Sequence, residues 1–215
     1  MFENIKNKLS IHFPKLQIKF KDQSVFMKIL GTILFFNKNY MTSFTTTIGN
    51  TVYFPTEQFV RTRAVSSFII LMHELVHISD SRRYNPFLFG FLYLFPQCLF
   101  LFSIPLFFLS WKAALLMLVF LAPIPSYFRM NFERRAYLVS LYVMHRLNLK
   151  GNYNINLDKQ KEFFLSSFKN SSYYFMWPFN NLDKQFDAAL IEIREGQRPY
   201  SDSVFDQIDS VMEDY

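Results

Sequence analysis

The sequence contains a single cysteine, Cys98, and only 5 glycines among its 215 residues. One cysteine cannot form an internal disulfide, which excludes a small secreted fold stabilised by disulfides and favours a reducing compartment. The scarcity of glycine excludes collagen-like and glycine-rich low-complexity chains. A disordered chain is excluded as well, because 51% of the residues are hydrophobic and 20% are aromatic. The length predicts one domain, or one domain with an appendage, that buries a sizeable core.

Charge is missing from two long stretches of the sequence. Residues 84–111 contain no Asp, Glu, Lys or Arg, and after Lys112 residues 113–128 are again uncharged. The first stretch is long enough to cross about 30 Å of hydrocarbon as a helix, at about 1.5 Å per residue. We interpret the pair as a membrane hairpin with Ser110-Trp111-Lys112 at its tip, since Trp and Lys are typical of a membrane–water boundary. The alternative is a buried helical hairpin in a soluble protein.

The charge that is present is unevenly distributed. The chain has a net charge of +6, to which residues 1–40 contribute +5, residues 41–150 contribute +6 and residues 151–215 contribute −5. Because the basic residues flank the apolar stretches, we expect a lipid bilayer with an anionic surface as a partner, and no nucleic acid. These ranges define a basic amphipathic N-terminal segment, a core with the hairpin 84–128 inserted, and an acidic helical C-terminal region. The first ten residues, MFENIKNKLS, are polar and predict no secretory signal.

Local periodicity predicts the remaining elements. Thr and aromatic residues over 41–54, with Gly49-Asn50 at the centre, indicate a β-hairpin. Thr56 is expected to cap a helix that runs to about Ser81. The other expected elements are a helix at 2–13, a strand at 15–21, a core or interfacial helix at 24–36, helices at 129–149, 160–169 and 182–195, an aromatic patch at 173–179, and a loosely held helix in the last fifteen residues. The expected fold class is therefore α+β and mainly α.

The motif His73-Glu74-Leu75-Val76-His77 lies within the helix that begins near Thr56. On a helix, His73 and His77 lie one turn apart on one face, so their imidazoles can bind one tetrahedral Zn²⁺. Glu74 lies beside them, where it can accept a proton from a metal-bound water. With 4 His and 8 Glu in 215 residues, about 0.003 such matches are expected by chance. The alternative is a pair of core histidines that hydrogen-bond internally.

A catalytic zinc normally has a third protein ligand and one open coordination position. The sequence lacks the third His of the pattern HExxH-xx-G-xx-H, and Glu133 is the best candidate in its place. It is the only acidic residue between Asp80 and Asp158, at the start of the first helix after the apolar hairpin. Ala136, one turn on, would let this helix approach the histidines closely. The alternative is an exposed Glu133 that pairs with a neighbouring arginine.

The order of HELVH, an apolar hairpin and E-x-x-A at Glu133 resembles the HtpX-like membrane zinc metallopeptidases, to which the CAAX prenyl proteases are related. The resemblance covers about residues 41–147. It implies a zincin-like core, one Zn²⁺ held by His73, His77 and Glu133, and Glu74 as the general base. It also implies that the substrate binds at the Thr-rich hairpin before the HELVH helix.

The sequence departs from this family after the E-x-x-A motif. The family usually has Asp at the next position, where it orients a ligand His, whereas this chain has Tyr137. Tyr137 or Asp80 could serve in its place. A peptidase also needs a group that stabilises the oxyanion, for which His145, Tyr137, Arg198 and Tyr200 are the candidates. His145 lies about 120° around the helix from Glu133, which favours a structural role for it.

The sequence therefore predicts a membrane-associated zinc-dependent metalloendopeptidase that hydrolyses a peptide or protein substrate with metal-activated water. The alternative is a catalytically inactive, peptidase-fold membrane protein with a structural or interaction role. Five arginines flank the hairpin on the side of the HELVH motif, against Lys112 at its tip. These are Arg82, Arg83, Arg129, Arg134 and Arg135. This bias predicts that the active site faces the cytoplasm.

Overall fold

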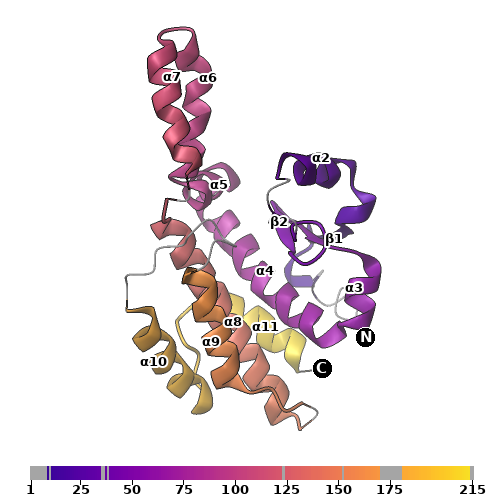
Figure 1. Ribbon diagram of the computed structural model, residues 1–215. Coiled ribbons are helices and arrows are strands. Elements are labelled where there is room, and N and C mark those ends of the chain that lie inside the picture. The colour runs from indigo at the N-terminus through magenta and orange to yellow at the C-terminus, as the bar shows by residue number, and fades with distance from the viewer. Residues whose placement is uncertain are drawn as a thin grey trace.

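The computed structural model describes residues 9, 11–34, 37, 39–122, 124–151, 153–169 and 181–213. Within these ranges the chain is mainly helical with one small sheet, which confirms the expected fold class. Two long helices, α4 (Ala64–Tyr84) and α8 (Tyr127–Leu149), pack side by side at the centre (Figure 1). The sheet lies on one side of this pair, C-terminal helices cover the other side, and a helical hairpin projects from one end.

The sheet has three short strands in the order β1-β3-β2, with β2 at one edge. β1 (Gln17–Phe20) is parallel to β3 (Thr51–Phe54), and β2 (Thr46–Ile48) is antiparallel to β3. The expected hairpin over 41–54 is confirmed, with its turn at Gly49, whose φ of 58° lies in the left-handed region that glycine adopts without strain. The alternating burial of β3 follows from the alternating direction of side chains along a strand.

In the N-terminal segment, a short 3₁₀ turn at Lys21–Gln23 follows β1 and contacts α2 (Val25–Ile33), the next helix along the chain. Ser24 caps α2 by accepting a hydrogen bond from the Met27 amide at 3.3 Å. Lys21 is fully buried, and its ammonium donates to the Tyr40 carbonyl at 2.7 Å. The expected helix at 2–13 falls largely outside the described residues, although residues 11 and 12 are helical.

The single helix expected from Thr56 onward is instead two helices, α3 (Glu57–Thr62) and α4. Thr56 caps α3 as expected, accepting from the Phe59 amide at 3.0 Å. The break lies at Arg63, whose φ of −126° and ψ of 48° are not helical. The Thr62 hydroxyl donates back to the Gln58 carbonyl, a bond that tends to bend helices. Because of this break, α4 runs in its own direction across the molecule.

The first apolar stretch is not the single straight helix that the sequence predicts. It forms α5 (Pro86–Leu94) and then, after a bend of 97°, a second helical segment over Gln97–Phe107. Pro96 explains the break, since proline has no N–H to continue a helix and restricts the residue before it. The Ser126 hydroxyl, which donates to the Phe95 carbonyl at 2.5 Å, fixes the bend against the start of α8.

The second helical segment returns as an antiparallel hairpin. The 3₁₀ helix Gln97–Phe102 and α6 (Ser103–Phe107) form the outgoing arm, and α7 (Trp111–Met117) with the 3₁₀ helix Leu118–Leu121 forms the returning arm. The turn lies at residues 108–110, beside the expected tip. Among the described residues, no single helix is both long and apolar enough to cross a membrane, whereas α5 and Gln97–Phe107 together meet that test as a bent pair.

Within the described part of the chain, three helices follow α8, namely α9 (Leu157–Lys169), α10 (Leu182–Arg194) and α11 (Val204–Met212). The expectation of a loosely held final helix is wrong, because apolar side chains at helical spacing bury α11 in the core. Its buried residues are Val204, Phe205, Ile208, Val211 and Met212. The core also includes residues of the N-terminal segment and of α4, so all three regions of the sequence share it. The aromatic patch expected at 173–179 lies outside the described residues.

Candidate metal centre

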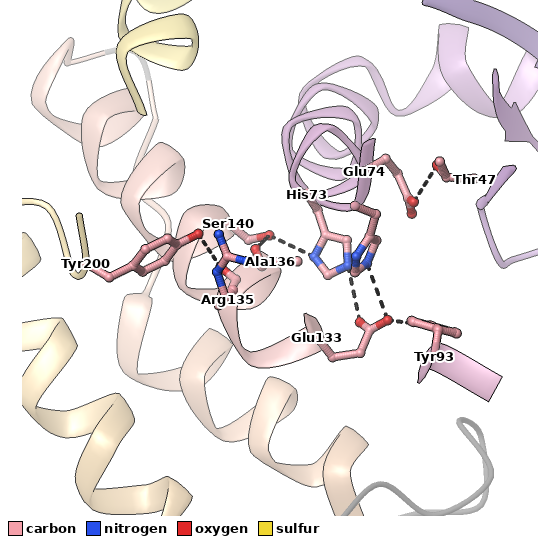
Figure 2. Close-up of polar contacts among 10 residues, drawn as sticks. Thr47, His73, Glu74, Tyr93, Glu133, Arg135, Ala136, Ser140 and Tyr200 are labelled. Carbon is pink, nitrogen blue, oxygen red and sulfur yellow. Dashed lines mark hydrogen bonds and ion pairs between the residues drawn. The ribbon is translucent and has the colours of Figure 1, made fainter. Parts of the chain in front are cut away.

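The two central helices bring three potential metal ligands together. α4 supplies His73 and His77, and α8 supplies Glu133, which is only 1% exposed. His73 Nε2 lies 3.3 Å from Glu133 Oε2, and His77 Nε2 lies 3.4 Å from Glu133 Oε1 (Figure 2). One ligand atom from each residue lies within 4.8 Å of the other two. This buried group could hold a metal ion, and Glu133 faces the histidines rather than a neighbouring arginine.

Electrostatics within the group favour a cation between these side chains. Burial alone would lower the pKa of His77, but the negative charges of Glu133, Glu74 and Asp80 raise it to about 9. Burial would raise the pKa of Glu133, yet the two histidines hold it well below its usual range. Without a metal, the buried carboxylate is therefore balanced by a proton on an imidazole. A metal ion would replace that proton as the balancing charge.

Small side chains on α8 allow the close approach to α4. Ala136, one turn after Glu133, is fully buried between the helices, as the sequence predicts. Ser140 follows one turn later, with its hydroxyl 3.4 Å from His73 Nδ1 and donating to the Ala136 carbonyl at 3.1 Å. That hydroxyl can accept a hydrogen bond from His73 Nδ1–H, which leaves Nε2 directed at Glu133. The sequence interpretation missed Ser140, although its spacing of seven residues from Glu133 places both on one helix face.

Tyr93 of α5 is a second residue that the sequence interpretation missed, and it contacts the candidate ligand Glu133. Its hydroxyl donates to Glu133 Oε1 at 2.5 Å (Figure 2). Its own backbone carbonyl accepts from Arg129 Nε at 2.9 Å, which ties α5 to α8. Tyr93 thus fixes the orientation of the Glu133 carboxylate. No signal in the sequence distinguished it from the other aromatic residues of an uncharged stretch.

Glu74 lies beside the three-residue group and points toward the sheet. Its Oε2 accepts a hydrogen bond of 2.7 Å from the Thr47 hydroxyl of β2 (Figure 2). The side chain is mostly buried, with 8% of the residue exposed. Because Glu74 follows His73 directly but faces the edge strand, its carboxylate is available to a molecule bound between β2 and the histidines.

Two clefts meet at His73 and Glu74, and both also include Phe44 and Thr45 just before β2. The first cleft, of about 580 Å³, extends between the β2 side of the sheet and α5 and includes His77 and Glu133. The second cleft, of about 670 Å³, extends between α4, α8 and α9. Its lining is largely apolar, with Ile69, Ile70, Met144, Phe163 and Phe164 among the contributors. The two clefts together form a path that passes the edge strand and the candidate metal ligands.

Tyr137 and Asp80, the residues expected to orient a ligand histidine, lie in different surroundings. The Tyr137 ring lies 4.9 Å from the His73 ring and stacks on Phe164 at 4.5 Å, so Tyr137 forms part of the second cleft wall. Asp80 is buried in an ion pair with Arg135, which also binds Asp202 at 2.5 Å. The carboxylate of Asp80 is thus engaged by an arginine. Among the described residues, His77 Nδ1 has no hydrogen-bond partner.

The remaining oxyanion candidates contribute to neither cleft. Arg198 pairs with Asp206 at 2.7 Å and with Asp209 at 2.8 Å. The Tyr200 hydroxyl donates to the Arg135 carbonyl at 3.2 Å. Burial and two nearby arginines lower the pKa of His145, which lies three turns beyond Glu133 on α8. These three residues therefore lie outside the candidate site, and Arg198 and Tyr200 make their polar contacts within the C-terminal half of the fold.

Comparisons of the chain with protein-family models, with curated protein sequences and with solved structures find no match. The resemblance to HtpX-like peptidases therefore stays a prediction that rests on the motifs. What the fold defines is a mainly helical protein with a buried His-His-Glu group that could hold a metal ion.

Proposed function

We propose that the chain is a membrane-associated zinc-dependent metalloendopeptidase with a zincin-like core. The observation that carries the proposal is the meeting of His73, His77 and Glu133 in one buried group, with Glu74 directly beside it. Two imidazoles and one carboxylate are a donor set that suits zinc, and three protein ligands leave a fourth position open for water. The arrangement is the one that the resemblance to HtpX-like peptidases implies.

The residues have distinct roles in the proposed reaction. When bound, zinc would supply the Lewis acidity that lowers the pKa of water and polarises a peptide carbonyl. Glu74 would accept the proton of the attacking water and deliver it to the amine of the departing peptide. Thr47 keeps the Glu74 carboxylate in place through its hydrogen bond. Tyr93 and Ser140 hold Glu133 and His73, so that the ligands need little reorganisation.

We further propose that the substrate binds as an extended peptide along β2. This strand forms the edge of the sheet, where a peptide can add main-chain hydrogen bonds. Its residues line the first cleft together with Glu74 and the histidines. The second, largely apolar cleft would take side chains of the same peptide.

Membrane association is supported by the exposed apolar residues of the hairpin. Phe107, Phe108 and Leu109 at the turn are 65%, 84% and 83% exposed, and Trp111 is 59% exposed. Contiguous exposed apolar side chains mark a membrane or protein interaction site. We propose that the hairpin inserts into a bilayer and that the active site faces the cytoplasm, as the flanking arginines predict.

The alternative of an inactive peptidase fold has its own supporting observation. Asp80 is held by Arg135, and His77 Nδ1 has no hydrogen-bond partner among the described residues. A ligand histidine usually has such a partner, which fixes its ring and its tautomer. Under this alternative the protein would act through its membrane and cleft surfaces without hydrolysing peptides.

The metal assignment is tested by the zinc content of purified protein. We expect the wild-type chain to carry about one zinc ion and His73→Ala to carry less than about a tenth of that, because the variant loses one of three ligands. His145→Ala is the matched control and should keep its zinc, since His145 lies outside both clefts. Full zinc content in His73→Ala, or none in the wild type, would contradict the assignment.

The orienting role of Tyr93 gives a second prediction. Tyr93→Phe removes the hydroxyl that donates to Glu133, and we expect zinc affinity to fall by about 10- to 100-fold. Competition with a chromophoric zinc chelator measures this change. Tyr84→Phe serves as the control, since Tyr84 lies at the exposed end of α4 and contacts Phe132 instead. Equal zinc affinity in the two variants would show that the phenol does not support the ligand.

A further inference from the structure

Helix α2 carries a stripe of exposed apolar side chains that no described element covers. Val25, Phe26, Ile29 and Ile33 are 72%, 56%, 57% and 63% exposed. At 100° per residue these positions fall within one narrow arc of the helix. Met27 points the opposite way, is fully buried and accepts a hydrogen bond from the Tyr40 hydroxyl at 3.4 Å. We call this stripe of four residues the α2 face.

Helix α2 lies at the same end of the molecule as the hairpin. In Figure 1, α2 and α5 are found on opposite sides of the gap above the sheet, and α6 and α7 project beyond both. α5 also exposes apolar residues, with Phe87 89% and Leu94 51% exposed. Leu30 of α2 and Phe89 of α5 both line the first cleft. The two helices that carry exposed apolar residues therefore also line this cleft, each with an apolar side chain.

We propose that the α2 face docks on the surface of a lipid bilayer, with α2 lying in the plane of the membrane beside the hairpin. This inference rests on the membrane association proposed above and adds a second, independent contact to it. With nine residues, α2 is about 14 Å long, which is far too short to cross the bilayer. An amphipathic helix of this kind instead buries its apolar side at the boundary between head groups and acyl chains.

Two observations favour lipid over a protein as the occupant of the α2 face. The face presents four apolar side chains, and the hydroxyl of the neighbouring Thr32 already donates to the Lys28 carbonyl of the same helix, whereas protein interfaces combine apolar and polar contacts. Lys28, the one charged residue of α2, is exposed and lies next to the stripe at 60° from Val25. From there its ammonium can reach an anionic head group while its methylene chain follows the apolar surface.

Depth-dependent fluorescence quenching tests the docking. In a Cys98→Ser background, Ile29→Cys is labelled with a nitrobenzoxadiazole dye, and the full chain is placed in nanodiscs of phosphatidylcholine and phosphatidylglycerol. Lipids with a nitroxide near the head group should quench this dye at least twofold more than lipids with a nitroxide near the chain end. The same dye at Leu149→Cys is the control, because Leu149 is 66% exposed but lies at the far end of α8.

A dye at Leu109→Cys reports separately on the hairpin tip. If the Leu109 dye is quenched but the Ile29 dye is not, the hairpin inserts and the α2 docking is wrong. If neither dye is quenched, the membrane association in the proposed function is wrong as well. A blue-shifted but unquenched Ile29 dye would mean that a second copy of the chain covers the face, which also overturns the docking.

A substitution in the α2 face tests whether quenching of the Ile29 dye comes from docking of this face on the bilayer. Phe26→Glu in the Ile29-labelled protein should abolish the shallow quenching, because it places a negative charge in the stripe. Ile191→Glu is the matched control, since Ile191 is also an exposed apolar residue, at 57%, but belongs to α10. Quenching that survives Phe26→Glu would contradict the proposal. Zinc content, measured in parallel, shows whether each variant keeps the fold.

Discussion

Replacing Glu74 with glutamine is expected to lower kcat for peptide hydrolysis by about 10²- to 10⁴-fold while zinc content stays unchanged. An amide cannot accept the proton of the attacking water, so the general base is lost. Glutamine keeps the size of the side chain, and its carbonyl oxygen can still accept the hydrogen bond from Thr47. The measurement pairs kcat on an unstructured peptide with metal analysis of the same sample.

Glu57→Gln is the matched control for this experiment. Glu57 belongs to α3, where it is exposed and pairs with Arg61 one turn away, so its loss should leave kcat unchanged. If the wild type cleaves peptides and Glu74→Gln does so at the same rate, the proposed role of Glu74 is wrong. If all three proteins bind zinc but cleave nothing, the inactive alternative is supported.

Arg135→Ala is expected to destabilise the fold by about 3–5 kcal/mol at neutral pH, because it leaves a buried carboxylate without its partner. Arg135 of α8 bridges Asp80 of α4 and Asp202, which precedes α11. Both aspartates are nearly inaccessible, with side chains 1% and 6% exposed. Urea denaturation followed by circular dichroism gives the change in the free energy of unfolding.

The pH dependence of the stability lost in Arg135→Ala tests whether the unpaired Asp80 carboxylate causes that loss. Burial raises the pKa of Asp80 and Arg135 lowers it, so removing Arg135 raises the pKa further above its unfolded value. A carboxyl with a raised pKa destabilises the fold above that pKa and stops doing so once it is protonated. The destabilisation should therefore shrink as the pH falls from 7 toward 5. Arg61→Ala, which breaks only an exposed pair with Glu57, should cost no more than about 0.5 kcal/mol at either pH.

The parts of the site that sequence alone could predict are those encoded by short spacing. His73 and His77 share a helix face because four residues make about one helical turn. Glu133 could be proposed because no other acidic residue occurs between Asp80 and Asp158. The structure brings these three residues together, although they come from two helices separated by the whole hairpin.

The parts that could not be predicted depend on how distant elements approach each other. The contact of Tyr93 with Glu133 depends on how α5 packs against α8, which follows it only after the whole hairpin. The hydrogen bond from Thr47 to Glu74 depends on how the sheet packs against α4. The arginines that were counted to predict membrane orientation also make contacts that sequence alone could not predict. Arg129 binds the Tyr93 carbonyl, and Arg135 binds Asp80. Those charges have structural partners in addition to any effect on membrane orientation.

The position of Thr47 on an edge strand has a consequence for the choice of substrate. Its side chain reaches the proposed base, and β2 lines the first cleft while leaving one edge of the strand without a neighbouring strand. A peptide that pairs with the main-chain groups of that edge must first be extended, because a helical segment has already used its own N–H and C=O groups. Main-chain hydrogen bonding to β2 would therefore restrict the substrates to unfolded or extended segments, whatever their side chains are. Stably folded proteins would escape cleavage until a local segment opens.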